Sequence, residues 1–419
     1  MNSAPEPQLD PRDIPTLGGF LRSASKTREE RLNPFPWYRQ KLDYGPIHWD
    51  QDTGAWDVFG YPEVEAVLAD HLHFSSARLA PLQQGRKGPT PNILSMDPPR
   101  HTSLRRLVNF AFTPKAIRCW GERIHAIVDG LLNDVDHRQD GSVFTWDIVG
   151  DLAYPLPVIV IAEMMGIPSS DRERFKEWSD TMVEGPESLE PLALMDLVNR
   201  KKTARNEMAT YFTEIVDRLS APSEQSLVAL LNAAEVDGEK LTADEIVSFC
   251  ILLLAAGNET TTNLITNMVR CIYQHPDTWT QMQEDPRLVG GFIEETLRFF
   301  SPVQATNRIA TENVELFGNQ ITRGDRVMLW LGAANRDARA FMQPDTFDLH
   351  RTPNHHLAFG HGIHFCLGAP LAKLEAEIVM TMLLARYRSI AEVPTDLEPI
   401  VSGFVFGVKA LPIRVARRT

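Results

Sequence analysis

Apolar and polar residues follow two different periods along this chain. Residues 35–74 are mixed: short runs at 47–49 and 56–59 predict strands, and residues 62–69 predict a helix. From about residue 100 to residue 298, apolar residues recur at helical spacing. The first three quarters of the chain are therefore predicted to be mainly helical, with strands near the start.

The pattern changes again in the last third. Short strand-like runs return between residues 302 and 327, with Gly318 and Gly324 as turn signals. Residues 335–359 have no sustained period, and a last long helix is predicted from Cys366 towards Arg386. An irregular connection of that length in a compact protein usually serves a site. The fold class that follows is mainly α, with small β-sheets at its margins.

The organisation is simple. Residues 1–30 are expected to be an N-terminal arm with little core, residues 31–419 a single catalytic domain, and residues 78–91 a loop. No segment reaches the about 18 to 20 apolar residues of a membrane span, and residues 249–257 are far too short. The polar, proline-rich start resembles no secretion signal. We expect a cytoplasmic protein without a membrane anchor.

Composition narrows the function classes. Apolar residues are 43% and charged residues 23% of the chain, as in ordinary folded domains. The net charge of -13 argues against nucleic acid as a partner. The four cysteines have no paired spacing, which makes a disulfide framework improbable. Cys250 and Cys271 lie in apolar helical context and are expected to be buried.

One predicted helix is unusually long. Residues 242–245, Thr-Ala-Asp-Glu, read as a capping box, and Pro276 ends the helix near Tyr273. Such a helix is about 45 Å long at ~1.5 Å per residue. Its middle combines Gly257, a carboxylate and three threonines, whose hydroxyls can bond back to carbonyls and open a groove. Local rule-breaking of this kind is expected at functional sites.

The segment 359–368, Phe-Gly-His-Gly-Ile-His-Phe-Cys-Leu-Gly, suits a sulfur ligand. Cys366 is predicted to open a helix, whose dipole and free N–H groups favour a thiolate. Glycines at 360, 362 and 368 permit positive φ and close approach of backbone to a flat ligand. Two other interpretations remain: a buried cysteine after a glycine-rich turn, or a zinc site using His361, His364 and Cys366.

Phe359, Gly362, His364, Cys366 and Gly368 together resemble the haem-ligand signature of the cytochrome P-450 superfamily. The resemblance extends from about residue 97 to residue 406. It implies a soluble, bacterial-type haem-thiolate monooxygenase, with a long central helix over haem b and a β-rich margin. It also implies that Cys366 is the axial ligand of the haem iron.

The middle of the long helix resembles the oxygen-binding helix of that family. Glu259 and Thr260 match its acid–alcohol pair, which delivers protons to bound O2 and is here the expected catalytic pair. Without the cysteine segment, Glu259 would be interpreted as a solvated residue and the threonines as packing. Ala256, one turn earlier, is expected to contact the haem.

Glu295 and Arg298 share a helix face and match the structural Glu-x-x-Arg motif of the family. A surface ion pair is the alternative, but the neighbouring residues are apolar, which suggests burial. The motif is expected to hold the irregular segment ahead of the cysteine. Phe347 and Arg351 resemble its partner stretch, and the residue that completes the network is not assigned.

Haem propionates need cationic or hydrogen-bonding partners. His101 and Arg105 are four residues apart on one helix face; an ordinary basic face is the alternative. By resemblance they bind the propionates together with Arg308 and His364. The complete set of expected haem-binding residues is His101, Arg105, Ala256, Arg308, Phe359, Gly360, His364, Cys366 and Gly368.

The resemblance places the substrate against apolar residues. Candidates are Leu252, Ala256, Val303, Phe404 and Val405, which could also be simple core residues. They suit a lipophilic small molecule such as a fatty acid, terpenoid or steroid. The expected reaction inserts one oxygen atom of O2 into a C–H bond. A non-catalytic haem protein, either a gas sensor or an electron carrier, is the alternative.

Electrons are expected from a separate protein. The chain ends soon after the last predicted strands, so we expect a ferredoxin or flavodoxin with its NAD(P)H reductase to supply them. Arg106, Lys115 and Lys373 are candidate docking residues on the cysteine side, although solvated charge is the ordinary role of each. We expect the protein to be a monomer.

Overall fold

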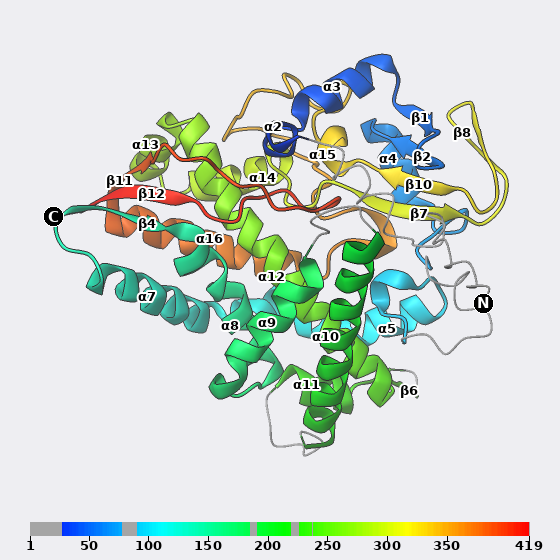
Figure 1. Cartoon of the computed structure of the whole chain (residues 1–419), viewed down its shortest axis with the longest axis horizontal. Coiled ribbons are helices and arrows are strands. Elements are labelled where there is room, and N and C mark those ends of the chain that lie inside the picture. Colours follow the sequence, from blue (N-terminus) through cyan, green and yellow to red (C-terminus); the bar gives the residue numbers. More distant parts are fainter. Residues whose placement is uncertain (1–26, 78–89, 185–190, 219–225, 237, 419) are drawn as a thin grey trace, which may run out of the picture.

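A computed structural model describes residues 27–77, 90–184, 191–218, 226–236 and 238–418. Its central element is α12 (Ala243–Gln274), which crosses the middle of the molecule (Figure 1). Thr242 caps this helix, and the reciprocal contacts between Thr242 and Glu245 form the predicted capping box. The predicted bounds of the long helix are therefore confirmed to within a residue.

Helices make up most of the described chain, and several of the longer ones pack against α12. The contacts of α12 with α8, α10, α14 and α16 place it inside the helical layer. Besides α12, the described helices of eight residues or more are α3 (Phe35–Tyr44), α4 (Tyr61–Ala69), α5 (Arg100–Asn109), α7 (Gly121–His137), α8 (Pro155–Met165), α9 (Arg172–Val183), α10 (Pro191–Arg218), α13 (Asp277–Glu284), α14 (Leu288–Phe299) and α16 (Ala369–Arg386).

Shorter helices join these elements: α2 (Arg28–Leu32), α6 (Pro114–Arg118), α11 (Leu227–Ala233), α15 (Leu331–Ala334) and the single turns Ile93–Ser95, Phe110–Phe112, Ser169–Asp171 and Gly362–His364. Residues Val149–Ala153 form a π-helical turn before α8. The expected boundary at residue 30 falls within α2. Most of the expected N-terminal arm lies outside the described residues, so the domain division stays a prediction.

The strands form small sheets at the margins. One sheet has the order β1-β2-β10-β7-β3, with β10 parallel to β2, and a second has the order β11-β12-β4. Their strands are β1 (Ile47–Asp50), β2 (Ala55–Val58), β3 (Phe74–Ser75), β4 (Val143–Asp147), β7 (Thr306–Ala310), β10 (Arg326–Leu329), β11 (Tyr387–Glu392) and β12 (Pro412–Arg417). Two hairpins add β5 (Glu235–Val236) with β6 (Glu239–Lys240), and β8 (Val314–Leu316) with β9 (Asn319–Ile321).

The predicted fold class, mainly α with small sheets, is confirmed. The strands expected at 47–49, 56–59 and 302–327 are present, and residues 335–359 contain neither helix nor strand. The loop expected at 78–91 lies mostly outside the described residues. Among the described residues, no helix is both long and apolar enough to span a bilayer.

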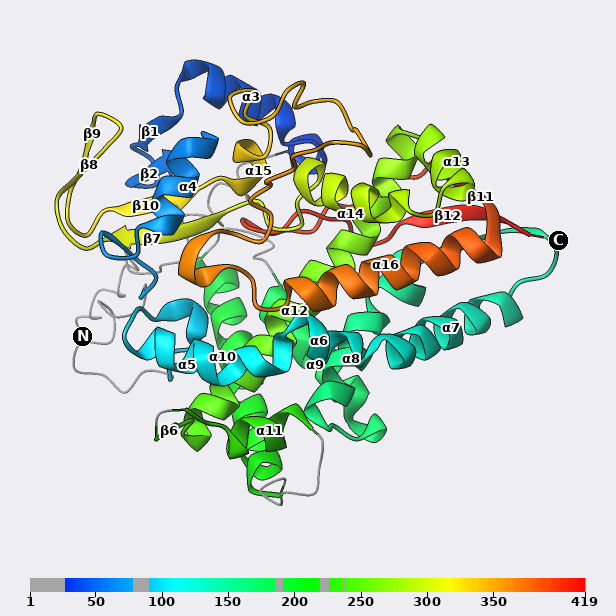
Figure 2. The same ribbon diagram turned by 180° about the vertical axis from the view of Figure 1, so that it is seen from behind.

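The start of the last helix was predicted wrongly. α16 begins at Ala369 with Gly368 as its cap, three residues after Cys366. Pro370 explains the difference, because its ring would clash with the carbonyl of residue 366 and it has no N–H to donate, whereas it fits the first turn of a helix. Figure 2 shows the segment before α16 lying between α4 and α5.

Candidate active site

A cavity of about 300 Å³ lies between α12, α8, β7 and the segment that precedes α16. Most side chains around it are apolar. Among the described residues, the charged side chains on its wall are Arg105 and Arg308, and Asp, Glu and Lys are absent from it. Cys366, Ala256 and Thr260 also face the cavity. The structure therefore brings the cysteine segment, the basic residues and the middle of α12 to one place.

The cysteine segment is a tight turn that glycine makes possible. Gly360 and Gly362 have φ values of 73° and 69°, in the left-handed region. A Cβ on Gly362 would lie 2.6 Å from the Leu68 carbonyl oxygen of α4, so no larger residue fits there. The Cys366 N–H donates to the Phe359 carbonyl at 2.9 Å. Gly368 differs from the prediction, since its φ is -82°.

The Cys366 sulfur is a candidate ligand held by backbone groups. Burial raises the pKa of the Cys366 thiol, while hydrogen bonds from the N–H groups of Gly368 and Ala369 and the Arg105 charge act in the opposite direction. These donors are at the N-terminus of α16. The positive end of the helix dipole therefore still points towards the sulfur, as predicted, although the helix begins three residues later than expected. A bound cation would supply the further charge that a thiolate needs here.

The four predicted anchors, His101, Arg105, Arg308 and His364, lie together. The rings of His101 and His364 are 4.4 Å apart, and Arg105, Arg308 and His364 line the cavity. Arg105 Nη2 donates to the Phe365 carbonyl at 2.8 Å, which fixes one side of its guanidinium. A guanidinium group is always charged and carries five N–H donors, so Arg105 and Arg308 make this wall suitable for an anion.

His101 is buried, and neither of its ring nitrogens has a hydrogen-bond partner within the described part of the chain. Burial, with a smaller contribution from the Arg105 charge, lowers the pKa of His101. A buried donor normally has a partner. A carboxylate of a haem in the cavity would provide one for His101, so the residues present fit haem b.

The zinc interpretation is not supported. Over the described ranges, no group of three or more histidines, cysteines and carboxylates is arranged to hold a metal ion. His361 turns instead towards Glu65, with Nδ1 and Oε1 4.0 Å apart.

The middle of α12 faces two ways. Ala256 and Thr260 line the cavity, and the Thr260 hydroxyl donates to the Ala256 carbonyl at 2.8 Å, as predicted for these threonines. α12 nevertheless continues without a break. Gly257 serves packing, because a Cβ there would lie 2.3 Å from Ile161 Cδ1 of α8.

Glu259 is adjacent to Thr260 in sequence but is not part of the cavity wall. Burial raises the pKa of its carboxyl to about 7, although the Lys201 charge on α10 lowers it. Asp180 on α9 acts in the same direction as burial. Asn263 donates to the Glu259 carbonyl at 2.7 Å. The carboxyl therefore lies towards α9 and α10, and can exchange a proton near neutral pH.

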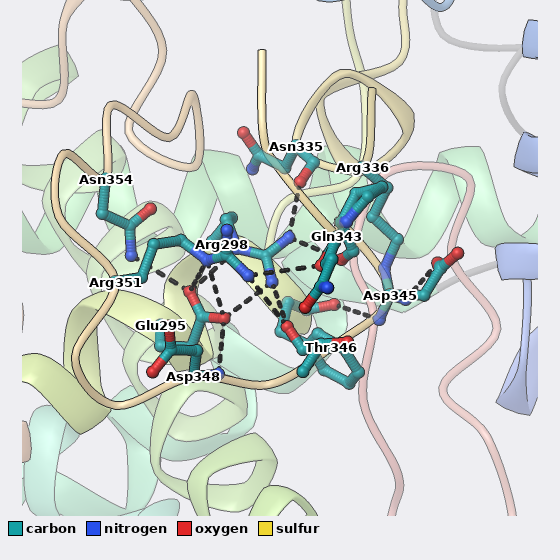
Figure 3. Close-up of polar contacts among 12 residues, drawn as sticks. Glu295, Arg298, Asn335, Arg336, Gln343, Asp345, Thr346, Asp348, Arg351 and Asn354 are labelled. Carbon is teal, nitrogen blue, oxygen red and sulfur yellow. Dashed lines mark hydrogen bonds and ion pairs between the residues drawn. The ribbon is translucent and has the colours of Figure 1, made fainter. Parts of the chain in front are cut away.

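Glu295 and Arg298 form a fully buried ion pair. Their side chains are 0% exposed, and Arg298 Nη2 lies 2.7 Å from Glu295 Oε1. Arg351 Nε lies 3.1 Å from both carboxylate oxygens, and Asn354 Nδ2 and the Asp348 N–H also donate to them (Figure 3). Arg351 thus completes the network that the sequence left open, and Asn354 is an addition.

Arg298 carries the network into the irregular segment. Its guanidinium donates to the carbonyls of Asn335, Pro344 and Thr346 at 2.8–3.0 Å (Figure 3). A segment without helix or strand needs such partners for its buried carbonyls. The expected structural role, holding the segment ahead of the cysteine, is thus met by hydrogen bonds to its backbone.

The structure divides the five substrate candidates. Leu252, Ala256 and Val303 line the cavity, whereas Phe404 and Val405 are not among the described lining residues. Val405 instead pairs with Val303 through a β-bridge, and the Phe404 carbonyl accepts the Gln304 N–H at 2.7 Å. Phe404 and Val405 therefore lie next to the residues of the wall and are not themselves part of it.

Sequence reasoning missed the contribution of α8. Ile161, Met164 and Met165 all line the cavity. The signal was present, because Glu163 is the one charged or polar residue of α8 and so apolar a helix must be largely enclosed by protein. Nothing in that pattern, however, distinguishes a cavity wall from core.

Comparisons with known proteins agree with this geometry. A family model described as "Cytochrome P450" matches residues 9–417. Cytochrome P450 109 of Bacillus spizizenii is 44% identical over 391 residues, which cover 93% of each chain. The crystal structure of substrate-free CYP109E1 from Bacillus megaterium matches with a TM-score of 0.87 and 43% identity, over 93% of this chain and all of that one. CYP109E1 in complex with testosterone matches at 0.82, with 42% identity over 91% of this chain and 99% of that one.

The chain belongs to the cytochrome P450 family. It is a P450 monooxygenase, and its cofactor is haem b, as in other members of the family. The alternative of a non-catalytic haem protein is thereby set aside.

Proposed function

We propose that this enzyme hydroxylates a C–H bond of a neutral, lipophilic small molecule such as a steroid or terpenoid. The observation that carries the proposal is the apolar cavity, bounded by Cys366 on one wall and by Ala256 and Thr260 on another. In such a cavity an apolar substrate is desolvated and held beside the reactive group.

The residues around the cavity divide the work of binding haem. Cys366 would ligate the iron, and His101, Arg105, Arg308 and His364 would hold the two carboxylates. Phe359, Gly360, Gly368 and Ala256 would contact the flat ring. When bound, the haem with its thiolate ligand supplies the site at which O2 is reduced and split.

Thr260 and Glu259 are proposed to supply protons. The Thr260 hydroxyl can present a hydrogen bond to the cavity, and the buried Glu259 carboxyl, with its pKa of about 7, can take protons from the side of α9 and α10. In Thr260→Ala, product formed per O2 consumed should fall about tenfold, with peroxide released instead. Thr260→Ser should retain most of the coupling, and tight coupling in the alanine variant would contradict the role.

The proposed substrate class rests on charge. The cationic residues on the described wall, Arg105 and Arg308, are assigned to the haem carboxylates. The carboxylate of a fatty acid would have no cationic partner left there, and burying it unpaired is costly. The crystal structure of CYP109E1 with testosterone, a neutral steroid, supports the same class.

A binding screen tests the substrate class. Matched steroids, terpenoids and fatty acids are titrated into the haem-loaded enzyme, and the low-to-high-spin shift is recorded. We expect neutral steroids or terpenoids to bind at least tenfold more tightly than fatty acids of similar size, a difference of about 1.4 kcal/mol. Tighter binding of the fatty acids would contradict the proposal. Isotope-labelled O2 then shows whether one oxygen atom enters the product.

A separate ferredoxin or flavodoxin is proposed as electron donor. Arg106 and Lys115 are exposed candidates for docking. Arg106 follows Arg105, which donates to the Phe365 carbonyl, and Lys115 is on α6, which packs against α16. Lys373 is less suitable, because it forms an ion pair with Glu294. A cytoplasmic location and a monomeric state remain predictions.

A further inference from the structure

Three polar side chains from separate elements meet beside the cysteine segment. The Oε1 atom of Glu294, on α14, lies 2.6 Å from the Nζ atom of Lys373, on α16. Its Oε2 atom lies 3.1 Å from Nε2 of His356, in the irregular segment. We call Glu294, Lys373 and His356 the Glu294 brace. It is distinct from the Glu295–Arg298 network, with which it shares no side chain.

Both partners of Glu294 contact the ring of Phe359. Lys373 Nζ lies 5.4 Å from its centroid, and the His356 ring is 6.1 Å away. The Ala358 N–H also donates a hydrogen bond to His356 Nδ1, with 3.4 Å between the two nitrogens. Phe359 is in turn joined to the ligand position, because its carbonyl accepts the Cys366 N–H at 2.9 Å. A chain of contacts therefore links Glu294 to Cys366.

The carboxylate of Glu294 is held in its charged form. Burial opposes ionisation, but the hydrogen bond with His356 and the pairing with Lys373 outweigh it and lower the pKa of Glu294 to about 2. Exposed ion pairs usually contribute little to stability. This one is about one third exposed, and its Lys373 also lies over an aromatic ring, so its geometry is more restricted than that of a solvated pair.

We propose that the Glu294 brace positions Phe359 and the turn to Cys366, and thereby sets how strongly the sulfur donates electrons to the haem iron. The proposal rests on the proposed role of Cys366 as ligand. The physical link is the pair of hydrogen bonds that the sulfur accepts from the Gly368 and Ala369 N–H groups. Such bonds withdraw electron density from a thiolate, so a turn that moves weakens them and strengthens donation.

Charge alone would give a different result. Removing the Glu294 charge takes a negative group away from the haem, which would raise the reduction potential, whereas removing the Lys373 charge would lower it. A positioning role predicts that both changes lower the potential, because either one opens the brace. The two explanations therefore differ in the sign of the effect of Glu294→Gln.

The experiment compares Glu294→Gln, Lys373→Met, the double variant and Lys373→Arg in the haem-loaded enzyme. We expect both single variants to lower the midpoint potential, and the double variant to resemble either single one. The thiolate-type band of the reduced carbon monoxide complex should convert to the thiol type about tenfold faster. Lys373→Arg, which keeps the positive charge, should have the midpoint potential and the conversion rate of the wild type. Glu377→Gln, an exposed site on α16, is the matched control.

Opposite shifts that cancel in the double variant would overturn the proposal in favour of simple electrostatics. Unchanged potentials and conversion rates would overturn it as well. If a variant folds poorly, Lys373→Arg and His356→Gln still test whether the contacts with Glu294 matter. A wild-type enzyme without the thiolate-type band would refute Cys366 as ligand, whereas a normal wild type with unresponsive variants would refute the brace alone.

Discussion

The two sides of the cavity are built from different chemistry. On the cysteine side, backbone without regular structure is held by buried charges: Arg298 alone donates to three carbonyls, and Glu295 accepts from four groups. On the α12 side, apolar side chains such as Leu252 of α12 and Met164 of α8 line the cavity, and they project from regular helices. Directional contacts define one geometry, whereas apolar packing tolerates several ligands.

The difference separates reaction type from substrate choice. A sulfur ligand must stay at one position, so its segment is fixed by hydrogen bonds that fail if an atom moves by an ångström. The substrate side needs only volume and desolvation. Changes on the cysteine side should therefore abolish or destabilise the enzyme, and changes on the α12 side should mainly tune it.

The largest effect is expected from Cys366→Ala. The variant should lose monooxygenase activity completely, together with the thiolate-type band of the reduced carbon monoxide complex, because no other cysteine lines the described cavity wall and a methionine thioether cannot become a thiolate. Absorption spectra and product analysis measure both. Cys119→Ala, at an exposed cysteine, should leave them unchanged. A thiolate-type band that survives in Cys366→Ala would refute the ligand assignment.

Glu295→Gln tests the buried network behind the ligand. Arg298 is 0% exposed and would lose its carboxylate partner, so the free energy of unfolding should fall by about 3–5 kcal/mol. Denaturant unfolding of the haem-loaded enzyme measures it. Glu377→Gln, at an exposed site, should change stability by less than about 0.5 kcal/mol. A loss as small as that of the control would show that the irregular segment does not depend on Glu295.

On the α12 side, Glu259→Gln should stabilise the protein in alkaline conditions. Burial raises the pKa of Glu259 from 4.5 to about 7, so between these values the folded state retains a proton that the unfolded state has lost. Stability therefore falls as pH rises through this range. We expect the variant to be more stable by about 1–3 kcal/mol at pH 8, with the gain shrinking below pH 7.

Unfolding curves from pH 5.5 to pH 8 measure the effect of Glu259→Gln. A stability difference that does not vary with pH would mean that Glu259 does not titrate in this range. The same variant should slow product formation, because an amide cannot pass on a proton. Loss of stability at pH 8 would show that the contact with Lys201 outweighs the cost of burial.

The smallest effect is expected at the surface. Arg106→Glu should slow reduction by an acidic ferredoxin several-fold at low salt, and substrate binding should be unchanged, because Arg106 is exposed on α5 and does not line the cavity. Stopped-flow reduction at two salt concentrations measures it, since screening should reduce the difference. Lys202→Glu, exposed on α10, is the control. Equal rates for Arg106→Glu and wild type would remove Arg106 from the docking surface.

Local signals predicted much of this molecule. The capping box at Thr242 gave the start of α12, and the apolar neighbours of Glu295 indicated that its pair with Arg298 is buried. The start of α16 was predicted wrongly, because Pro370 fits only the first turn of a helix and so excludes Cys366 from α16. Lys373 was expected at the docking surface, and its pairing with Glu294 could not be read from a separation of 79 residues.

By itself, the sequence determined the elements, because helical period and caps are short-range patterns. The glycine-flanked cysteine and its resemblance to the family indicated the class of reaction, and Cys366 as the ligand stays a prediction. Only the tertiary structure decided which side chains share a cavity, that Glu259 turns away from it, and that Arg351 completes the Glu295–Arg298 network. Those facts depend on where distant segments meet, and a residue's side chain direction is set by packing that no local pattern contains.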